Sequence, residues 1–356
     1  MVNLKLNNFL IKGFIFNALT VFVCAFVVSG CATNKKIKPY VVTTPLPNDP
    51  DDAAVWIDSK SPHKSRIYIN DKHKNGGIYV FELDGKPAAD ISAQSLQRPN
   101  NIDAIQGLNW VLNKDSVQGL LFATERLTQK VKVYALPDLK LVNLEGFDVF
   151  VEDTSKNVDR HSPMGIAVGS NKAKDTLHIY VSRKNGPSVG YLAEYQLTHS
   201  QKHGLKWEFV RNLGLFSGLK EIESVAVNHA LNELIYSDEG FGIRTFSLTK
   251  QTNDSFGMKQ FKADVEGICV VNGLTDFPDG LICVSDQQRN SINFFNAKTK
   301  QFFGKVRIAA TETDGIDYLP LLSAELPYGT LLVMNNKNHN FHYYSLKQLI
   351  DRIPKN

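Results

Sequence analysis

The chain has 356 residues, 43% of them hydrophobic, and its 40 basic and 36 acidic residues leave a formal net charge of only +4. No block of like charge occurs, which argues against a nucleic-acid surface, so we expect no nucleic-acid partner. The four cysteines lack the Cys/His spacing of a zinc site.

Residues 1–30 have the pattern of a bacterial lipoprotein signal peptide. A basic start is followed by a long apolar run, and the small residues Ser29 and Gly30 stand directly before Cys31. We therefore expect lipidation of Cys31, with contact to the membrane only through this lipid anchor. Because Ala32 is not the Asp that suggests inner-membrane retention, the expected location is the outer membrane of a Gram-negative bacterium. An uncleaved membrane anchor is the alternative, since the apolar run is about long enough to span a bilayer.

Residues 31–50 are rich in Thr, Asn, Lys and Pro and predict a polar tether. No linker-like break follows Pro50, so we expect residues 51–356 to form one domain, present as a monomer. That length exceeds the usual size of one compact core, and a fold whose core is divided among repeats would explain it.

A strand pattern that places a shared aromatic residue between apolar positions recurs six times, at spacings of 49 to 61 residues. A period of this length indicates one supersecondary unit per repeat, stacked so that neighbours bury each other's apolar faces. Six such units predict an all-β fold, a six-bladed β-propeller. The shared aromatic residues, which we expect in the cores of the blades, are Phe81, Tyr134, Tyr195, Phe246, Phe295 and Tyr344.

Two further strands precede the aromatic strand in each repeat, with turn residues between them. A single helix is predicted, over residues 346–353. The expected strands span 54–57, 66–70 and 78–83; 102–105, 120–124 and 131–136; 165–168, 178–182 and 192–197; 225–228, 234–237 and 243–248; 267–270, 281–285 and 292–296; and 315–318, 331–334 and 341–346.

Polar residues recur at the start of the first strand and at the end of the second strand of each repeat. Any single pair is explained by an ordinary solvated turn. Equivalent positions of a propeller converge on one end of its central channel, however, and so many carboxylates cannot all stay ionised without a positive partner. Calcium ions match such oxygen ligands, and the neighbouring cations Lys72, Arg126 and Lys184 would suit a phosphate ester.

The ordered succession of these motifs resembles the β-propeller phytases, which are six-bladed, calcium-dependent enzymes that hydrolyse phytate. The resemblance runs from about Asp49 to Leu349. It is carried by Asp51-Asp52-Ala53-Ala54-Val55-Trp56, Asn70-Asp71-Lys72, Asn100-Asn101-Ile102-Asp103, Asp264-Val265-Glu266-Gly267, Ser285-Asp286-Gln287 and Thr313-Asp314-Gly315-Ile316-Asp317.

The resemblance implies a role for each matched residue. Phosphate monoesters, above all phytate, would be hydrolysed by attack of a water held between several calcium ions. Catalysis and phosphate binding would involve Lys72, Arg126, Lys184, Glu223 and Gln287. Calcium would be held by Glu223, Asp238, Asp264, Glu266 and Asp314, and in partly structural positions by Asp52, Asn101 and Asp103.

Several positions depart from the family pattern, namely Met164, Asp238, Asn335, Asn336 and His342. Lost charge at ligands would lower calcium affinity, so two other functions stay open. One is a non-catalytic, calcium-stabilised propeller that binds a phosphorylated ligand or an envelope partner. The other is a calcium-dependent lactonase or arylesterase, for which His161 is the candidate base.

Cys269 and Cys283 lie on two apolar runs joined by a turn, so they could face each other. A disulfide and a pair of buried thiols are both compatible with this placement.

Overall fold

The computed structural model describes residues 35–112, 114–200, 204–262 and 264–353. The signal peptide over residues 1–30 and the lipidation site Cys31 lie outside the described residues and stay predictions. No helix within the described ranges is both long enough and apolar enough to cross a membrane.

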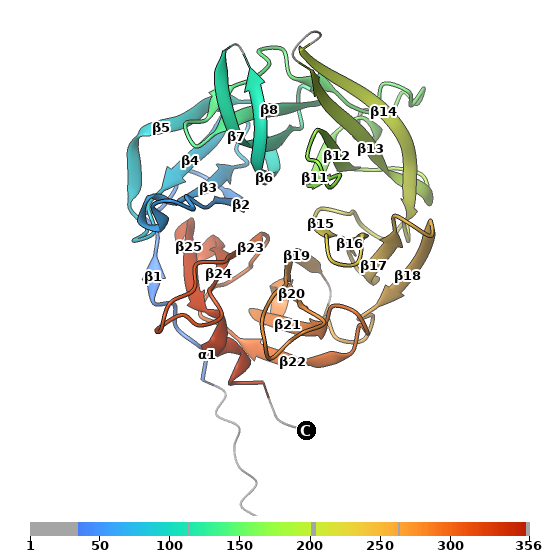
Figure 1. Ribbon diagram of the computed structural model, residues 1–356. Coiled ribbons are helices and arrows are strands. Elements are labelled where there is room, and N and C mark those ends of the chain that lie inside the picture. The colour runs from blue at the N-terminus through green and yellow to red at the C-terminus, as the bar shows by residue number, and fades with distance from the viewer. Residues whose placement is uncertain (1–34, 113, 201–203, 263, 354–356) are drawn as a thin grey trace, which may run out of the picture. The chain divides into compact units, whose positions relative to one another are not determined.

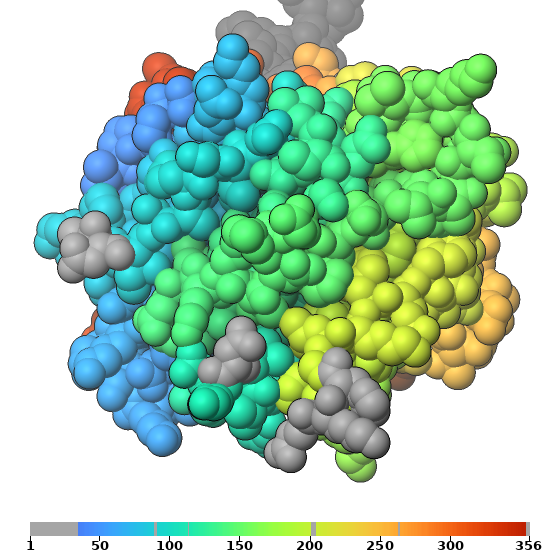
Figure 2. Space-filling model, turned by 90° about the horizontal axis from the view of Figure 1, so that it is seen from above, coloured from blue at the N-terminus to red at the C-terminus, as the bar shows by residue number. Residues whose placement is uncertain are grey.

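Six antiparallel sheets are arranged in a ring around a central channel (Figure 1), which confirms the predicted all-β, six-bladed β-propeller. Viewed edge-on in Figure 2, the segments follow one another along the rim in chain order. The first three blades comprise β2 (Pro50–Trp56), β3 (Arg66–Asp71), β4 (Gly76–Phe81) and β5 (Pro87–Leu96); β6 (Pro99–Leu112), β7 (Asp115–Glu125), β8 (Lys130–Leu136), β9 (Lys140–Leu141) and β10 (Phe147–Asp148); and β11 (Pro163–Ser170), β12 (Thr176–Arg183), β13 (Val189–Ser200) and β14 (Gly204–Leu215).

The last three blades have the same order of strands. They comprise β15 (Val225–Asn228), β16 (Glu233–Asp238), β17 (Gly242–Ser247) and β18 (Thr252–Phe256); β19 (Val265–Val271), β20 (Leu281–Asp286), β21 (Ser291–Asn296) and β22 (Phe302–Arg307); and β23 (Ile316–Leu319), β24 (Thr330–Asn335), β25 (Asn340–Ser345) and β1 (Val41–Val42). The short helices are η1 (Pro62–Lys64), η2 (Val158–Arg160), η3 (Gln287–Arg289), η4 (Asn336–Asn338) and α1 (Leu346–Ile350).

The ring is closed by strand β1, which pairs antiparallel with β25 through Val41 opposite Tyr343 and Val42 opposite His342. The sixth blade therefore joins one strand from the beginning of the chain to three from its end. The folded unit begins at Lys35, before the boundary expected at Pro50. Two β-branched residues in a polar segment are too short a pattern to identify as a strand.

The shared aromatic residue is buried in all six blades, as predicted, and contributes to the apolar layers between blades. The three inner strands of each blade also coincide with the predicted ones. The fourth, outermost strands were missed, and β18 shows why: its sequence Thr-Asn-Asp-Ser-Phe is mostly solvent-exposed and lacks an alternating apolar face. The predicted helix at 346–353 is present but shorter, as α1, and Ser345 caps it by accepting a hydrogen bond from the Gln348 amide.

Candidate active site

The first strands of four blades are interrupted by register shifts where they reach one end of the channel, which we call the pore mouth. In blade 1 the shift falls between Pro50 and Ala53, and in blade 2 between Pro99 and Ile102. Blades 3 and 5 have equivalent shifts. Bulges of this kind redirect side chains and are common beside active sites. Here they place the polar residues at strand starts outside the regular ladder.

The polar pair that ends each second strand has two different surroundings. Asp71 accepts hydrogen bonds from the backbone amides of Asn48 (3.1 Å) and Asp49 (3.0 Å), and so fixes the preceding connection. The next residue, Lys72, reaches the pore mouth instead. Successive side chains of a strand point in opposite directions, so only the second member of each pair is available to the site.

Lys72 connects blades 1 and 6 at the pore mouth. Its Nζ lies 2.6 Å from Asp51 Oδ1 and 2.6 Å from Asp314 Oδ2. Although burial alone would lower it, the pKa of Lys72 is raised by the carboxylates of Asp51, Asp314 and Glu223. Gln287 donates from Nε2 to Asp314 Oδ1 at 2.6 Å. The structure thus brings Lys72, Asp314 and Gln287, which the sequence placed in the site, together with Asp51, which was not among the predicted site residues.

Glu223 connects blades 2 and 4. Its Oε1 accepts a hydrogen bond of 2.5 Å from Asn100 Nδ2. Burial raises the pKa of Glu223, and the carboxylates of Asp314 and Glu221 add to this effect while Lys72 opposes it. Two acids near Glu223 therefore disfavour its ionised form unless a cation binds among them.

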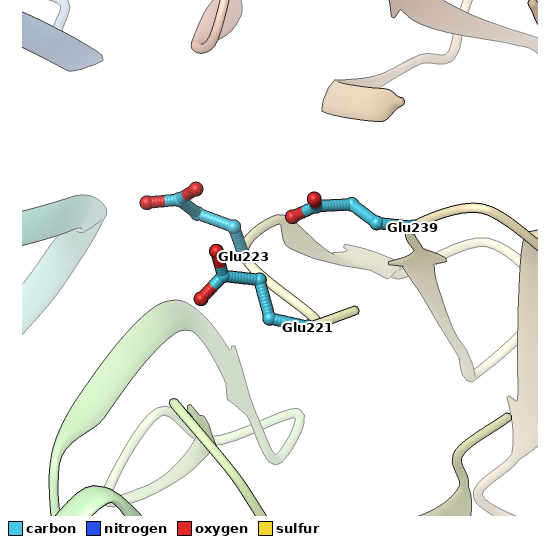
Figure 3. A group of neighbouring side chains, drawn as sticks. All are labelled: Glu221, Glu223 and Glu239. Atoms are coloured by element: carbon cyan, nitrogen blue, oxygen red, sulfur yellow. The ribbon is translucent and has the colours of Figure 1, made fainter. Parts of the chain in front are cut away.

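Two overlapping groups of carboxylates meet on the side of blades 4 and 5. Oxygens of Glu221, Glu223 and Glu239 lie within 4.8 Å of one another, and so do oxygens of Glu239, Asp264 and Glu266. Figure 3 shows the three glutamates of the first group close together; Glu221 and Glu223 come from the segment before β15, and Glu239 directly follows β16. Glu239 is shared by both groups.

Glu239 is the residue whose environment most clearly calls for a cation. It is only 5% exposed, and its Oε1 is buried without a hydrogen-bond partner among the described residues. Burial, together with Glu221, Glu223 and Asp264, raises the pKa of Glu239 to about 9. Burial raises the pKa of Glu266 as well, and the carboxylates of Glu239, Glu223, Asp314 and Asp264 add to this effect. A hard divalent ion with oxygen ligands fits this set.

The other predicted cations stand around the same acids. Lys184 pairs with Glu221, and Lys220, which was not predicted, pairs with Asp264. Among the described residues, the Arg126 side chain makes one hydrogen bond, of 3.5 Å, to Asn100 Oδ1.

Asp238, predicted as a metal ligand, is not brought into the cluster. Its carboxylate accepts hydrogen bonds from the Ser217 amide (2.9 Å) and from Arg244 Nε (2.5 Å), away from the other acids. Glu239 occupies the corresponding place because it is the second member of its pair. The sequence already favoured Glu239 over Asp238, because Lys72 and Gln287 are also the second residues of the polar pairs that end second strands.

Asp52, Asn101 and Asp103 line the channel itself, in a cavity of about 180 Å³. Asn101 Nδ2 donates to Asp52 Oδ2 at 3.2 Å, and the Val168 amide donates to Asp103 Oδ2 at 2.7 Å. Burial raises the pKa of Asp52 and of Asp103 to about 7. Asp317, which was not selected from the sequence, lines the same cavity, and burial raises its pKa too.

Three of the positions that depart from the family pattern have different surroundings in the structure. Met164 is buried. His342 is buried as well, and its own burial lowers its pKa to about 4. Asn336 lines the space beside Lys72 and Gln287 and donates to Glu312 at 2.8 Å.

His161, the candidate base of a lactonase, has both ring nitrogens directed at backbone carbonyls. They lie 3.2 Å from Phe150 O and 2.8 Å from Ser155 O, so neither nitrogen is available to a substrate. Cys269 and Cys283 lie opposite each other on β19 and β20 as buried free thiols.

Acids and cations gathered at the pore mouth of a propeller suit the binding of divalent ions and of anionic esters. The family model described as Phytase matches residues 32–344. The chain is also 22% identical, over 349 residues, to a 3-phytase of Bacillus subtilis (strain 168), an alignment that covers 89% of this chain and 85% of the relative. The chain therefore belongs to the phytase family, whose chemistry is phosphate ester hydrolysis.

Proposed function

We propose that this protein is a calcium-dependent phosphomonoesterase and that phytate is its substrate. The observation that carries the proposal is the buried carboxylate of Glu239, unpartnered at Oε1 and shared by two groups of acids within 4.8 Å. Such a set stays fully ionised at neutral pH only with positive charge among its oxygens.

The residues present suit calcium. Glu223, Glu239, Asp264 and Glu266 offer carboxylate oxygens from blades 4 and 5, and Asp314 adds one from the segment before blade 6. Calcium accepts six to eight oxygen ligands in flexible geometry, which irregular strand ends can provide. When bound, the metal would supply Lewis-acid activation of a water and neutralisation of phosphate charge.

The cations of the chain would bind and orient the substrate. Lys72, Arg126 and Lys184 come from three consecutive blades, and Lys72 and Lys184 pair with Asp314 and Glu221. Arg forms paired hydrogen bonds to phosphoryl oxygens, and Lys acts as a mobile point charge. Gln287, whose Nε2 is 2.6 Å from Asp314, would hold that carboxylate in place beside the phosphate.

We further propose that the propeller works close to a membrane. Nine residues lie between Cys31 and Val41, where β1 begins. Even fully extended, such a segment reaches only about 35 Å, so a lipid on Cys31 would keep the enzyme near the surface of the outer membrane.

The decisive assay is phosphate release from phytate by protein lacking residues 1–31. We expect release with calcium and none with chelator. Glu266→Gln should abolish the calcium-dependent rate while preserving the fold, whereas Glu208→Gln, at a side chain 47% exposed, should not change it. If calcium raises the melting temperature without phosphate release, the protein is the non-catalytic propeller instead.

A further inference from the structure

Arg98 stands at the pore mouth without an established role. It lies directly before β6, in the left-handed backbone region with φ of +61°. The Arg126 amide donates to the Arg98 carbonyl at 3.1 Å, and the Leu127 amide donates to the Gln97 carbonyl at 3.2 Å. Arg98 is therefore fixed beside the end of β7, from which Arg126 extends.

The guanidinium of Arg98 has no anionic partner. Throughout the described ranges its side chain makes no hydrogen bond or ion pair, and its Nε is buried. Arg244, by contrast, is paired with Asp238 at 2.5 Å. A buried N–H donor without a partner costs free energy, so its presence points to a ligand that accepts its hydrogen bond.

Arg98 and Arg126 together form a pair of like charges. Burial lowers the pKa of Arg126, and the neighbouring charge of Arg98 lowers it further, while the carboxylates of Glu221, Glu223 and Asp159 oppose this effect. The one side-chain hydrogen bond of Arg126, at 3.5 Å to Asn100, is too long to offset this. An anion that lies between the two guanidinium groups would relieve both the repulsion and the missing hydrogen bonds.

We propose that Arg98 is a substrate-binding residue that shares one phosphoryl group of the substrate with Arg126. This inference rests on the proposed function. A phosphate monoester carries two charges and presents three oxygens, enough for two planar guanidinium groups. A diester carries a single charge and fewer free oxygens. Arg98 therefore favours monoesters over diesters.

The test compares Arg98→Met, Arg98→Lys and the charge-matched control Arg66→Met. Arg66 pairs with Glu82 at the beginning of β3, at the end of the blade opposite the pore mouth. We expect Arg98→Met to raise the KM for phytate about tenfold with kcat changed less than twofold. Arg98→Lys should recover part of the loss, and Arg66→Met should match the wild type.

The preference for monoesters should also fall about tenfold in Arg98→Met, measured as the ratio of kcat/KM for a nitrophenyl phosphate monoester and its diester. A purely structural role would lower the melting temperature and leave this ratio unchanged. An unchanged KM, or an equal loss with Arg66→Met, would overturn the inference.

Failure of the proposed function can be distinguished from failure of the proposal about Arg98. If the wild type releases no phosphate, titration calorimetry with phytate replaces the kinetic assay. Weaker binding by Arg98→Met, about tenfold, would support Arg98 as a phosphate-binding residue of a non-catalytic site. Equal binding by wild type and variant would overturn it.

Discussion

Glu239→Gln is predicted to stabilise the metal-free protein, although it removes a residue of the candidate active site. The unfolded chain ionises Glu239 near pH 4.5, and in the folded protein its pKa is about 9. The folded state must therefore take up a proton at pH 7. Gln is a neutral side chain of the same shape and avoids this step.

The size of the effect follows from proton linkage. A raised carboxyl pKa contributes stability that is fully present below pH 4.5 and is lost as the pH rises towards 9. At pH 7 the loss is about 3 kcal/mol. We therefore expect the variant to be more stable than the wild type by about that amount, or about 5 °C or more in melting temperature. At pH 4.5 the two proteins should melt together.

Calcium should reverse the order of stability, so that the wild type becomes more stable than Glu239→Gln. With the ion bound the carboxylate of Glu239 has its partner, so the wild type gains stability that the Gln variant lacks. The assay is thermal unfolding of both proteins, with chelator and with excess calcium, between pH 4.5 and pH 8. The reasoning is refuted if Glu239→Gln is the less stable protein in chelator at pH 7. Glu208→Gln, at an exposed position, should show no difference in any condition.

Three further predictions concern other parts of the molecule. Lys72→Met should lower kcat/KM about 100-fold, because Lys72 joins Asp51 and Asp314 where the phosphate would bind, and steady-state kinetics tests this. Asp238→Asn should cost about 3 kcal/mol by denaturant titration, since it leaves the largely enclosed Arg244 charge, 11% exposed, without its carboxylate partner, yet calcium affinity by calorimetry should stay unchanged. A chain that starts at Thr43 should melt about 5 °C below one that starts at Lys35, because it lacks the strand that closes blade 6.

The blade count and the inner strands could be predicted from sequence because each repeat buries its aromatic strand on both faces. Phe295 and Tyr344 are almost completely buried, and the number of residues between them is the length of one blade. The outer strands face solvent on one side and lack an alternating apolar pattern, as β18 shows. Strand β1 could not be predicted because its partner, β25, lies about 300 residues further along the chain.

The site could be predicted as a region but not in every residue. Lys72, Asp264, Glu266 and Asp314 were selected because polar residues recur at strand ends, and their side chains lie at the pore mouth. The choice between Asp238 and Glu239 depends on which way the last residue of β16 points. Resemblance favoured Asp238, whereas the alternation of strand side chains selects Glu239.

Diffraction from crystals grown with calcium tests most directly whether the acids at the pore mouth bind this ion. Anomalous difference density should appear among the carboxylate oxygens of Glu223, Glu239 and Glu266, with Asp238 still paired to Arg244. Crystals that diffract well yet show no ion among those three glutamates at millimolar calcium would contradict the account.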